Sequence, residues 1–158
     1  MELDRIDRKI LKLLQDDNQI TNLDLADQVG LSPAACLRRV RRLTSEGIIE
    51  ANVAILNPAL AGVNVTVVVD VKIARAKYEL MEEFKRKVRQ APEVSQCYLV
   101  TGRSDFILVV QVRDMAEYEL FIRNRLYNDP IVESMNSMVV VSRVKFRPQI
   151  HLAEDDAG

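Results

Sequence analysis

The 158-residue sequence is poor in the side chains that form covalent or metal-bound centres. It holds two cysteines, one histidine and no tryptophan, and aromatic residues make up only 5% of the chain. Cys36 and Cys97 lie far apart, so neither a disulfide framework nor a CxxC metal knuckle can be built from them. His151 is the single histidine, which excludes a multi-histidine metal site within one chain. We therefore expect no metal, no cofactor and a reduced, cytoplasmic protein.

The sequence also lacks the segments that carry a protein into or across a membrane. No apolar run approaches the roughly 20 residues that a membrane helix requires, and the start, MELDRIDRK, has no signal-peptide stretch. No P-loop, GxSxG or GxGxxG motif occurs and no catalytic constellation is present, so we expect no enzyme. The composition is 48% hydrophobic and 28% charged, which is ordinary for one compact globular domain or two small ones.

Neither sign of charge is in excess, but one basic cluster stands out. The formal net charge is -1, and residues 1–50 carry 8 Lys and Arg against 9 Asp and Glu. Four of those positive charges fall within five residues, namely Arg38, Arg39, Arg41 and Arg42. The local distribution of charge decides nucleic-acid binding more than the net charge does. These four arginines can therefore form a basic patch although the net charge is close to zero.

Polar caps and apolar periodicity predict three helices in the first 50 residues. Asp4 caps the first helix, which runs to about Gln15, and a shorter helix follows a polar turn. The third helix opens at Ser32-Pro33 and runs to about Glu46. This order is the helix-turn-helix plan. The segment Ile48–Ile55 then resembles a strand, which we expect to form a wing.

The third helix carries the basic cluster, so its outward face indicates whether this helix-turn-helix binds DNA. We expect its inward face to hold Cys36, Leu37, Val40 and Leu43. Residues at i, i+3, i+4 and i+7 from Ala35 then share the opposite face, where guanidinium groups can contact phosphates or the edge of guanine. The alternative to DNA contact is that the arginines form only a solvated basic face. Small residues at the start of the helix favour DNA contact, because they let the helix lie close to the wall of a DNA groove. The expected DNA contacts are Ser32, Ala34, Ala35, Arg38, Arg39 and Arg42.

The rest of the chain alternates strand and helix patterns behind a short linker. From Val63 the apolar period changes to two, which is typical of a strand. The predicted order is β-α-β-β-α-β, a ferredoxin-like α+β layout with two helices on one face of an antiparallel sheet. Its expected elements are strands 63–73, 94–101, 106–112 and 137–146 and helices 78–90 and 114–127. The expected domains are 1–50, a linker at 51–62, the sheet domain at 63–147 and a polar tail at 148–158.

Two segments of the predicted sheet are apolar on both faces, Phe106–Val112 and Met138–Val141. Two helices cover only one face, so we expect another subunit to cover the second. The protein is then a homodimer joined through its sheets. The alternative is a monomer whose sheet is prone to aggregation.

Five short segments occur in a specific order and spacing. They are LDRIDRKIL at 3–11, GLSP followed by CLRRVRRL within 30–43, EGII at 46–49, LNP at 56–58 and VTGRSDFIL at 100–108. Over about residues 3–147 the chain resembles the Lrp/AsnC (leucine-responsive/asparagine-responsive) family of transcription regulators. The resemblance implies a winged helix-turn-helix and a RAM domain that pairs subunits and binds small effectors, usually amino acids. The implied partners are double-stranded DNA, an amino-acid effector, and further copies in a homodimer that assembles to a tetramer or octamer.

The resemblance also implies an effector site at the loop between the second and third RAM strands. A zwitterionic amino acid needs N–H groups for its carboxylate, which a glycine turn exposes, and an acceptor for its ammonium, which Asp105 offers. The opposite wall comes from the start of the last strand, where Met135 replaces the hydroxyl residue of many relatives. The site residues so implied are Val100, Thr101, Gly102, Ser104, Asp105, Asn136 and Ser137.

Three functions remain open at this point. The first is a sequence-specific transcriptional regulator whose DNA binding responds to an amino acid. The second is an enzyme, because some tetrapyrrole decarboxylases resemble this family in both domains; such an enzyme needs several basic or histidine side chains, and this chain has only His151. The third is an architectural DNA-binding protein without an effector.

Overall fold

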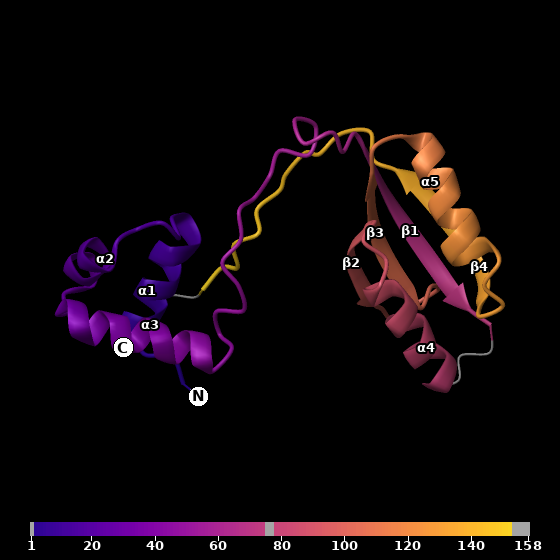
Figure 1. Cartoon of the computed structure of the whole chain (residues 1–158). Helices are drawn as coiled ribbons and strands as arrows, with labels where there is room; N and C mark the ends of the chain where they lie inside the picture. The colour runs from indigo at the N-terminus through magenta and orange to yellow at the C-terminus, as the bar shows by residue number, and fades with distance from the viewer. Residues whose placement is uncertain (1, 75–77, 153–158) are drawn as a thin grey trace. The chain divides into compact units, whose positions relative to one another are not determined.

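The computed structural model describes residues 2–74 and 78–152. Contacts within the chain divide it into two compact units (Figure 1). The first unit holds the residues up to Ala54 together with those from Lys145 onward, and the second unit holds Ile55–Val144. Within the described ranges, no helix combines the length and apolar character needed to cross a membrane.

Three helices build the first unit, α1 (Arg5–Asp16), α2 (Asn22–Val29) and α3 (Pro33–Ser45), which confirms the predicted helix-turn-helix plan. Each helix begins at a side-chain cap that accepts a hydrogen bond from the N–H three residues later; the caps are Asp4, Thr21 and Ser32. Gly30 ends α2 at a φ of 71°, a left-handed conformation that glycine adopts without strain.

The expected wing strand at 48–55 is wrong, because these residues form no strand. The N–H groups of Ile48 and Ile49 both donate to the carbonyl of Leu43, at 2.9 and 3.1 Å, so the chain wraps around the end of α3. Both isoleucine side chains pack against the core of the first unit, which contains the fully buried Ile10, Cys36 and Leu43. Burial in a turn therefore accounts for Ile48 and Ile49, whereas Val53 and Ile55 further along the run are exposed.

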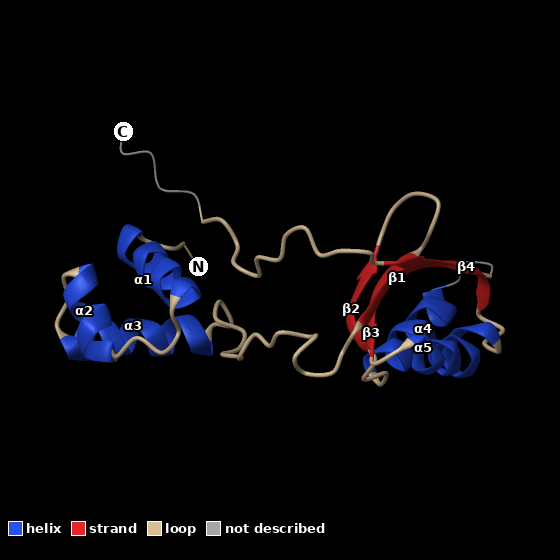
Figure 2. Ribbon diagram, turned by 90° about the horizontal axis from the view of Figure 1, so that it is seen from above, coloured by secondary structure: helices blue, strands red, loops and turns tan. Residues whose placement is uncertain are grey.

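The second unit is a four-stranded antiparallel sheet with helices on one face. In chain order its elements are β1 (Val65–Ile73), α4 (Tyr78–Arg89), β2 (Val94–Leu99), β3 (Phe106–Val112), α5 (Met115–Ile122), the π-helical turn η1 (Arg123–Tyr127) and β4 (Val132–Val139). The strands lie in the order β2-β3-β1-β4, and all neighbours are antiparallel. Figure 2 shows α4 and α5 on the same side of the sheet. The predicted α+β, βαββαβ fold is confirmed.

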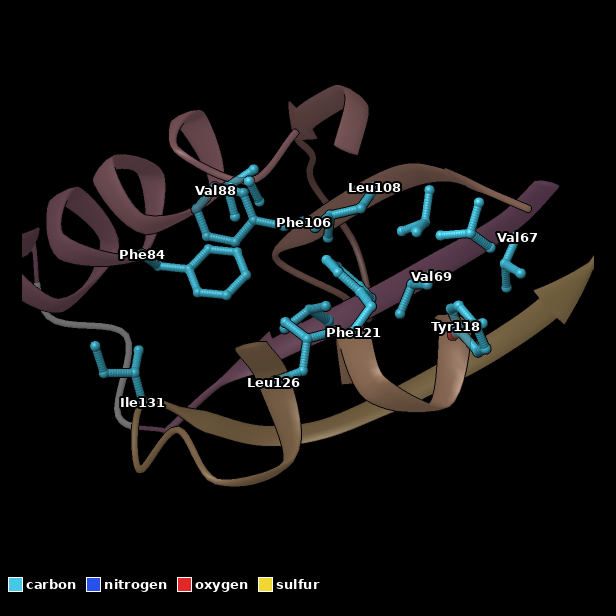
Figure 3. Packing of buried hydrophobic residues seen from close by; sticks show 14 of the residues in the cluster. Val67, Val69, Phe84, Val88, Phe106, Leu108, Tyr118, Phe121, Leu126 and Ile131 are labelled. Carbon is cyan, nitrogen blue, oxygen red and sulfur yellow. The ribbon is translucent and has the colours of Figure 1, made fainter. Parts of the chain in front are cut away.

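Alternation along the central strands places one set of side chains beneath the helices. Val67, Val69 and Val71 of β1 are fully buried, as is Leu108 of β3. Phe84 of α4 lies against Phe106 with ring centroids 4.8 Å apart (Figure 3). Burying an aliphatic or aromatic side chain of this kind contributes roughly 1.5–3 kcal/mol. A shift of one residue in register would expose this whole set, so the register is strongly specified.

The last strand lies earlier in the chain than the sequence predicted. It was expected at 137–146, but β4 pairs with β1 from Val132 opposite Ile73 to Val139 opposite Val67. One more bond, from the N–H of Val140 to the carbonyl of Thr66 at 2.9 Å, reaches the start of β1. The valine-rich residues 139–141 favour a strand by composition, but β1 begins only at Val65 and offers no partner to the segment beyond them.

The second face of the sheet is covered by neither helix. Its centre is apolar: Val68 lies opposite Val109 of β3 on one side and Met138 of β4 on the other. The two valines are half-buried and Met138 is exposed. Ile107 extends the same surface along β3. We refer to Val68, Ile107, Val109 and Met138 as the open sheet face.

The segment after β4 returns to the first unit and docks on α1. The side chain of Gln15 accepts the N–H of Ile150 at 2.8 Å and donates to its carbonyl at 3.2 Å. The side chain of Gln149 donates to the carbonyl of Gln15 at 3.2 Å, and Leu152 packs against the helical core. The sequence predicted only a polar tail at 148–158; residues 149–152 are attached to the helical unit, and 153–158 lie outside the described residues.

Replacing Leu152 with alanine tests this attachment. The side chain is half-buried, so its loss is expected to cost the first unit about 1 kcal/mol and to speed amide exchange in α1. Hydrogen exchange read by mass spectrometry measures the effect. Val144→Ala is the matched control, because Val144 is 95% exposed. Equal exchange of α1 in the two variants would show that the docked segment does not stabilise the helix.

Candidate functional sites

A buried carboxylate holds two of the basic residues of α3. Asp7 of α1 is 1% exposed, and its oxygens accept hydrogen bonds from Arg39 at 2.8 Å and Arg42 at 2.5 Å. Arg39 also donates to Asp4, at 2.5 Å. The expectation that Arg39 and Arg42 lie on the outward face is therefore wrong: both turn toward α1. The reason is electrostatic, since a buried carboxylate requires a paired cation.

The same contacts shift the pKa values of the groups involved. The pKa of Asp4 lies below its ordinary value, first because Asp4 accepts the backbone N–H of Asp7 and then because Arg39 donates to it. Hydrogen bonds to Asp4 and then to Asp7 raise the pKa of Arg39. Both shifts favour the charged forms, so this ion pair persists at neutral pH.

The exposed face of α3 is displaced by one residue from the expected face. Ala34, Leu37, Arg38 and Arg41 are exposed and follow the spacing i, i+3, i+4 and i+7. Leu37 was expected to face inward, but it is 39% exposed, and Ala35 is half-buried. We call Ala34, Leu37, Arg38 and Arg41 the recognition face.

Of the residues predicted to contact DNA, Ser32, Ala34 and Arg38 are exposed as expected. Arg41 is the exposed cation that the sequence analysis left out of its predicted contacts. The signal for it lay in the buried positions: Cys36 and Leu43 are both fully buried and seven residues apart, which sets the inward direction of the helix.

The loop between β2 and β3 is held to β1 through Asp105. A carboxylate oxygen of Asp105 accepts the N–H of Ile73 at 2.8 Å, and its own N–H donates to the carbonyl of Val71 at 2.9 Å. The N–H of Val100 donates to the carbonyl of Asp105 at 2.9 Å, which closes the loop. One oxygen of the carboxylate that was expected to bind an effector therefore shapes the loop instead.

Backbone donors at the tip of this loop suit an anion. Within residues 2–74 and 78–152, no carbonyl accepts the N–H groups of Thr101, Gly102 or Arg103. Gly102 has a φ of 120°, a conformation that strains residues with a side chain. Consecutive N–H groups on such a turn can bind a carboxylate.

Asp70 of β1 brings two of the expected effector residues together, although the sequence analysis did not select it. One oxygen of Asp70 accepts the hydroxyl of Ser104 at 3.0 Å, and the other accepts the side-chain amide of Asn136 at 3.2 Å. Asp70 lies opposite Ile107 and Asn136 in the strand register, so its side chain is on the same side of the sheet as the open sheet face. The signal for it was an acid within the valine-rich run VTVVVDVKI.

The neighbours of Asn136 on β4 point to the opposite face. Ser137 lies opposite Val69, and its hydroxyl is 2.5 Å from the hydroxyl of Tyr118 on α5. Burial raises the pKa of Tyr118, and the hydrogen bond to Ser137 opposes that shift. Met135 packs against the hydrophobic core. Of the expected β4 wall, only Asn136 reaches Asp70.

The two thiols and the acidic side chains offer no alternative centre. Among the described residues, no group of three or more His, Cys, Asp or Glu is placed to hold a metal ion. Burial raises the pKa of Cys36 and, despite nearby cations, of Cys97. A raised pKa keeps a thiol protonated and weakly nucleophilic at neutral pH.

Both units match known domain families. Residues 3–50 match the winged helix-turn-helix DNA-binding family, and residues 66–150 match the Lrp/AsnC ligand binding domain. Fold and matches together define a transcriptional regulator with a DNA-binding unit and a ligand-binding unit. The chain belongs to the Lrp/AsnC family of transcriptional regulators.

Curated relatives cover most of the chain. An HTH-type transcriptional regulator of Sinorhizobium fredii is 46% identical over 145 residues, which are 92% of this chain and 86% of the relative. The leucine-responsive regulatory protein of Haemophilus influenzae is 41% identical over 143 residues, 90% of this chain and 86% of the relative. That of Escherichia coli is 39% identical over 144 residues, 91% of this chain and 88% of the relative. These relatives are regulators, which confirms the non-enzymatic prediction and sets the decarboxylase alternative aside.

Solved structures agree over the whole fold. A transcriptional regulator from Neisseria meningitidis in complex with L-methionine gives a TM-score of 0.88 at 33% identity, covering 95% of this chain and 97% of that one. An AsnC family regulator from Agrobacterium tumefaciens gives a TM-score of 0.87 at 33% identity, and the match covers 94% of this chain and 96% of that one.

Removing the charge of Asp7 tests the anchoring of α3. Asp7→Asn removes the carboxylate that Arg39 and Arg42 share and leaves Arg39 with Asp4 alone, so we expect the free energy of unfolding to fall by about 2 kcal/mol; partial exposure of both arginines keeps the loss below that of a fully buried pair. Urea unfolding followed by circular dichroism measures it. Asp27→Asn, at an exposed position of α2, is the control. Equal stabilities of the two variants would contradict the anchoring role.

Proposed function

We propose that this regulator binds DNA through the recognition face of α3 and changes its affinity when an amino acid binds to the second unit. The observation that carries the proposal is the exposure of Arg38 and Arg41 beside Ala34 on the third helix of a helix-turn-helix. A protein that binds chromosomal DNA in bacteria, the organisms of its relatives, works in the cytoplasm.

The recognition face has the chemistry that the major groove requires. Ala34 is small and lies in the first turn of α3, so the helix can approach the groove closely there. Arg38 and Arg41 can donate to phosphates or to the O6 and N7 atoms of guanine, and Leu37 can contact a thymine methyl group. Arg39 and Arg42 serve DNA binding indirectly, by fixing the rotation of α3 against α1.

The proposed effector is an amino acid held at the loop between β2 and β3. Donors on Thr101, Gly102 and Arg103 suit its carboxylate. The related regulator from Neisseria meningitidis was solved with L-methionine, an apolar amino acid. Leucine is the amino acid in the names of several relatives, so we extend the proposal to apolar amino acids as a class.

The proposed assembly is a homodimer joined through the open sheet face. Val68, Ile107, Val109 and Met138 form an apolar centre that neither α4 nor α5 covers. A second copy presents the same surface, and packing two such faces removes both from water. Dimers of this kind are proposed to assemble further, to a tetramer or octamer.

Alanine substitutions on the recognition face test the DNA interface. We expect Arg38→Ala and Arg41→Ala each to weaken binding to the DNA upstream of the protein's own gene by roughly tenfold, since a good arginine contact is worth about 1–3 kcal/mol. Titrations at two salt concentrations, with scrambled DNA for comparison, distinguish the contacts. A lost base contact relaxes sequence preference, whereas a lost phosphate contact lowers the salt slope by about 1.

Arg86→Ala is the matched control for these titrations, because Arg86 is an exposed arginine on α4 of the other unit. We expect it to bind DNA as the unaltered protein does. Affinity and salt slope unchanged in both α3 variants would refute the recognition face.

Thermal unfolding in the presence of single amino acids tests the effector. A ligand that binds only the folded protein stabilises it, by about 2.7 kcal/mol at 100 times its Kd. We expect L-methionine or L-leucine to raise the Tm and to change the affinity for upstream DNA. Selective DNA binding that ignores all twenty amino acids would instead identify an architectural protein without an effector.

A further inference from the structure

Asp70 is a half-buried carboxylate on the uncovered side of the sheet, and within residues 2–74 and 78–152 no cation forms an ion pair with it. Its two hydrogen-bond donors, the Ser104 hydroxyl and the Asn136 amide, are both neutral. Lys72, the next residue of β1 on the same side, is paired with Glu133 at 3.1 Å. The donors orient the carboxylate without neutralising it, which leaves a cation to be supplied.

The carboxylate has room for such a cation. An ionised aspartate offers about four lone-pair positions, and one on each oxygen is used by Ser104 and Asn136. If a second copy packs on the open sheet face, water is excluded from this region and the demand for a compensating charge increases. A cationic ligand group at Asp70 would meet that demand.

Ser104 connects Asp70 to the donors of the loop. Its hydroxyl lies 3.0 Å from Asp70, and its backbone directly follows Thr101, Gly102 and Arg103, whose N–H groups suit a carboxylate. The carboxylate and ammonium groups of an α-amino acid are separated by one carbon atom. Ser104 thus joins a loop whose N–H groups suit the carboxylate of an amino acid to an acid that suits its ammonium group.

We propose that Asp70 accepts the α-ammonium group of the amino-acid effector, an assignment that rests on the effector function proposed above. Asp105 is the other acid of the site, but its carboxylate and its own N–H both bond to the backbone of β1, which gives it a structural role in the loop. Asp70 thus selects ligands with a primary ammonium beside the carboxylate, while Asp105 holds the loop in shape.

The experiment compares amino acids with their hydroxy-acid analogues on the full-length protein. The probes are L-methionine and L-leucine, each beside the 2-hydroxy acid that keeps its carboxylate and side chain but replaces the ammonium with a hydroxyl. Titration calorimetry gives Kd for the unaltered protein, for Asp70→Asn and for Glu119→Gln. Glu119→Gln is the matched control, because it removes one carboxylate at an exposed position of α5, on the covered side of the sheet.

We expect the unaltered protein and Glu119→Gln to bind the amino acid at least tenfold more tightly than its hydroxy acid, and Asp70→Asn to lose that preference. The comparison of ligands on the unaltered protein needs no variant, so it stands even if Asp70→Asn folds poorly. Equal binding of the amino acid and the hydroxy acid by the unaltered protein would overturn the assignment.

Two further outcomes separate this inference from the function on which it rests. If Asp70→Asn keeps the preference, or changes only the mass of the assembly in light scattering, the ammonium is bound elsewhere and Asp70 serves the subunit contact; the effector function then survives. If none of the twenty amino acids binds the unaltered protein, the effector function fails and the role of Asp70 fails with it.

Discussion

One buried carboxylate decides which side of the third helix the protein presents. Asp7 lies between Arg39 and Arg42, so rotation of α3 about its axis would leave a charge buried without a partner. This constraint exposes Arg38 and Arg41 and places Leu37 beside them. The acidic residues of α1 thus do not merely reduce the charge available for DNA. They divide the basic cluster into two arginines that hold the fold and two that face solvent.

Local signals explain why the helices were predictable from the sequence and the face of α3 was not. The caps at Asp4 and Ser32 and the turn at Gly30 depend on residues within a few positions, and all three form as predicted. The face of α3 had two solutions one residue apart, since positions from Ala34 and from Ala35 both satisfy i, i+3, i+4 and i+7. The partner on α1, more than 30 residues away, selects between them.

The effector site divides in the same way. The resemblance predicted its loop residues, because VTGRSDFIL is one continuous segment. The sequence did not point to Asp70, the acid of the proposed site, since its contacts lie 34 and 66 residues away and depend on the register of β1 with its two neighbours. Ser137 was selected with Asn136 as a continuous pair, yet alternation in β4 sends one side chain toward Asp70 and the other toward Tyr118.

The strands that carry the Asp70 cluster also lead to the DNA-binding unit. β1 follows the linker from that unit, and β4 continues into the segment that docks on α1 through Gln149 and Ile150. Because β1 and β4 are antiparallel neighbours, both connections leave the sheet at the same end. Asp70 and Asn136 lie opposite each other on these strands, so a ligand that favours one spacing between them acts on both connections at once. In the function proposed above, such a ligand shifts the population of arrangements, and the DNA affinity then changes by the same coupling free energy.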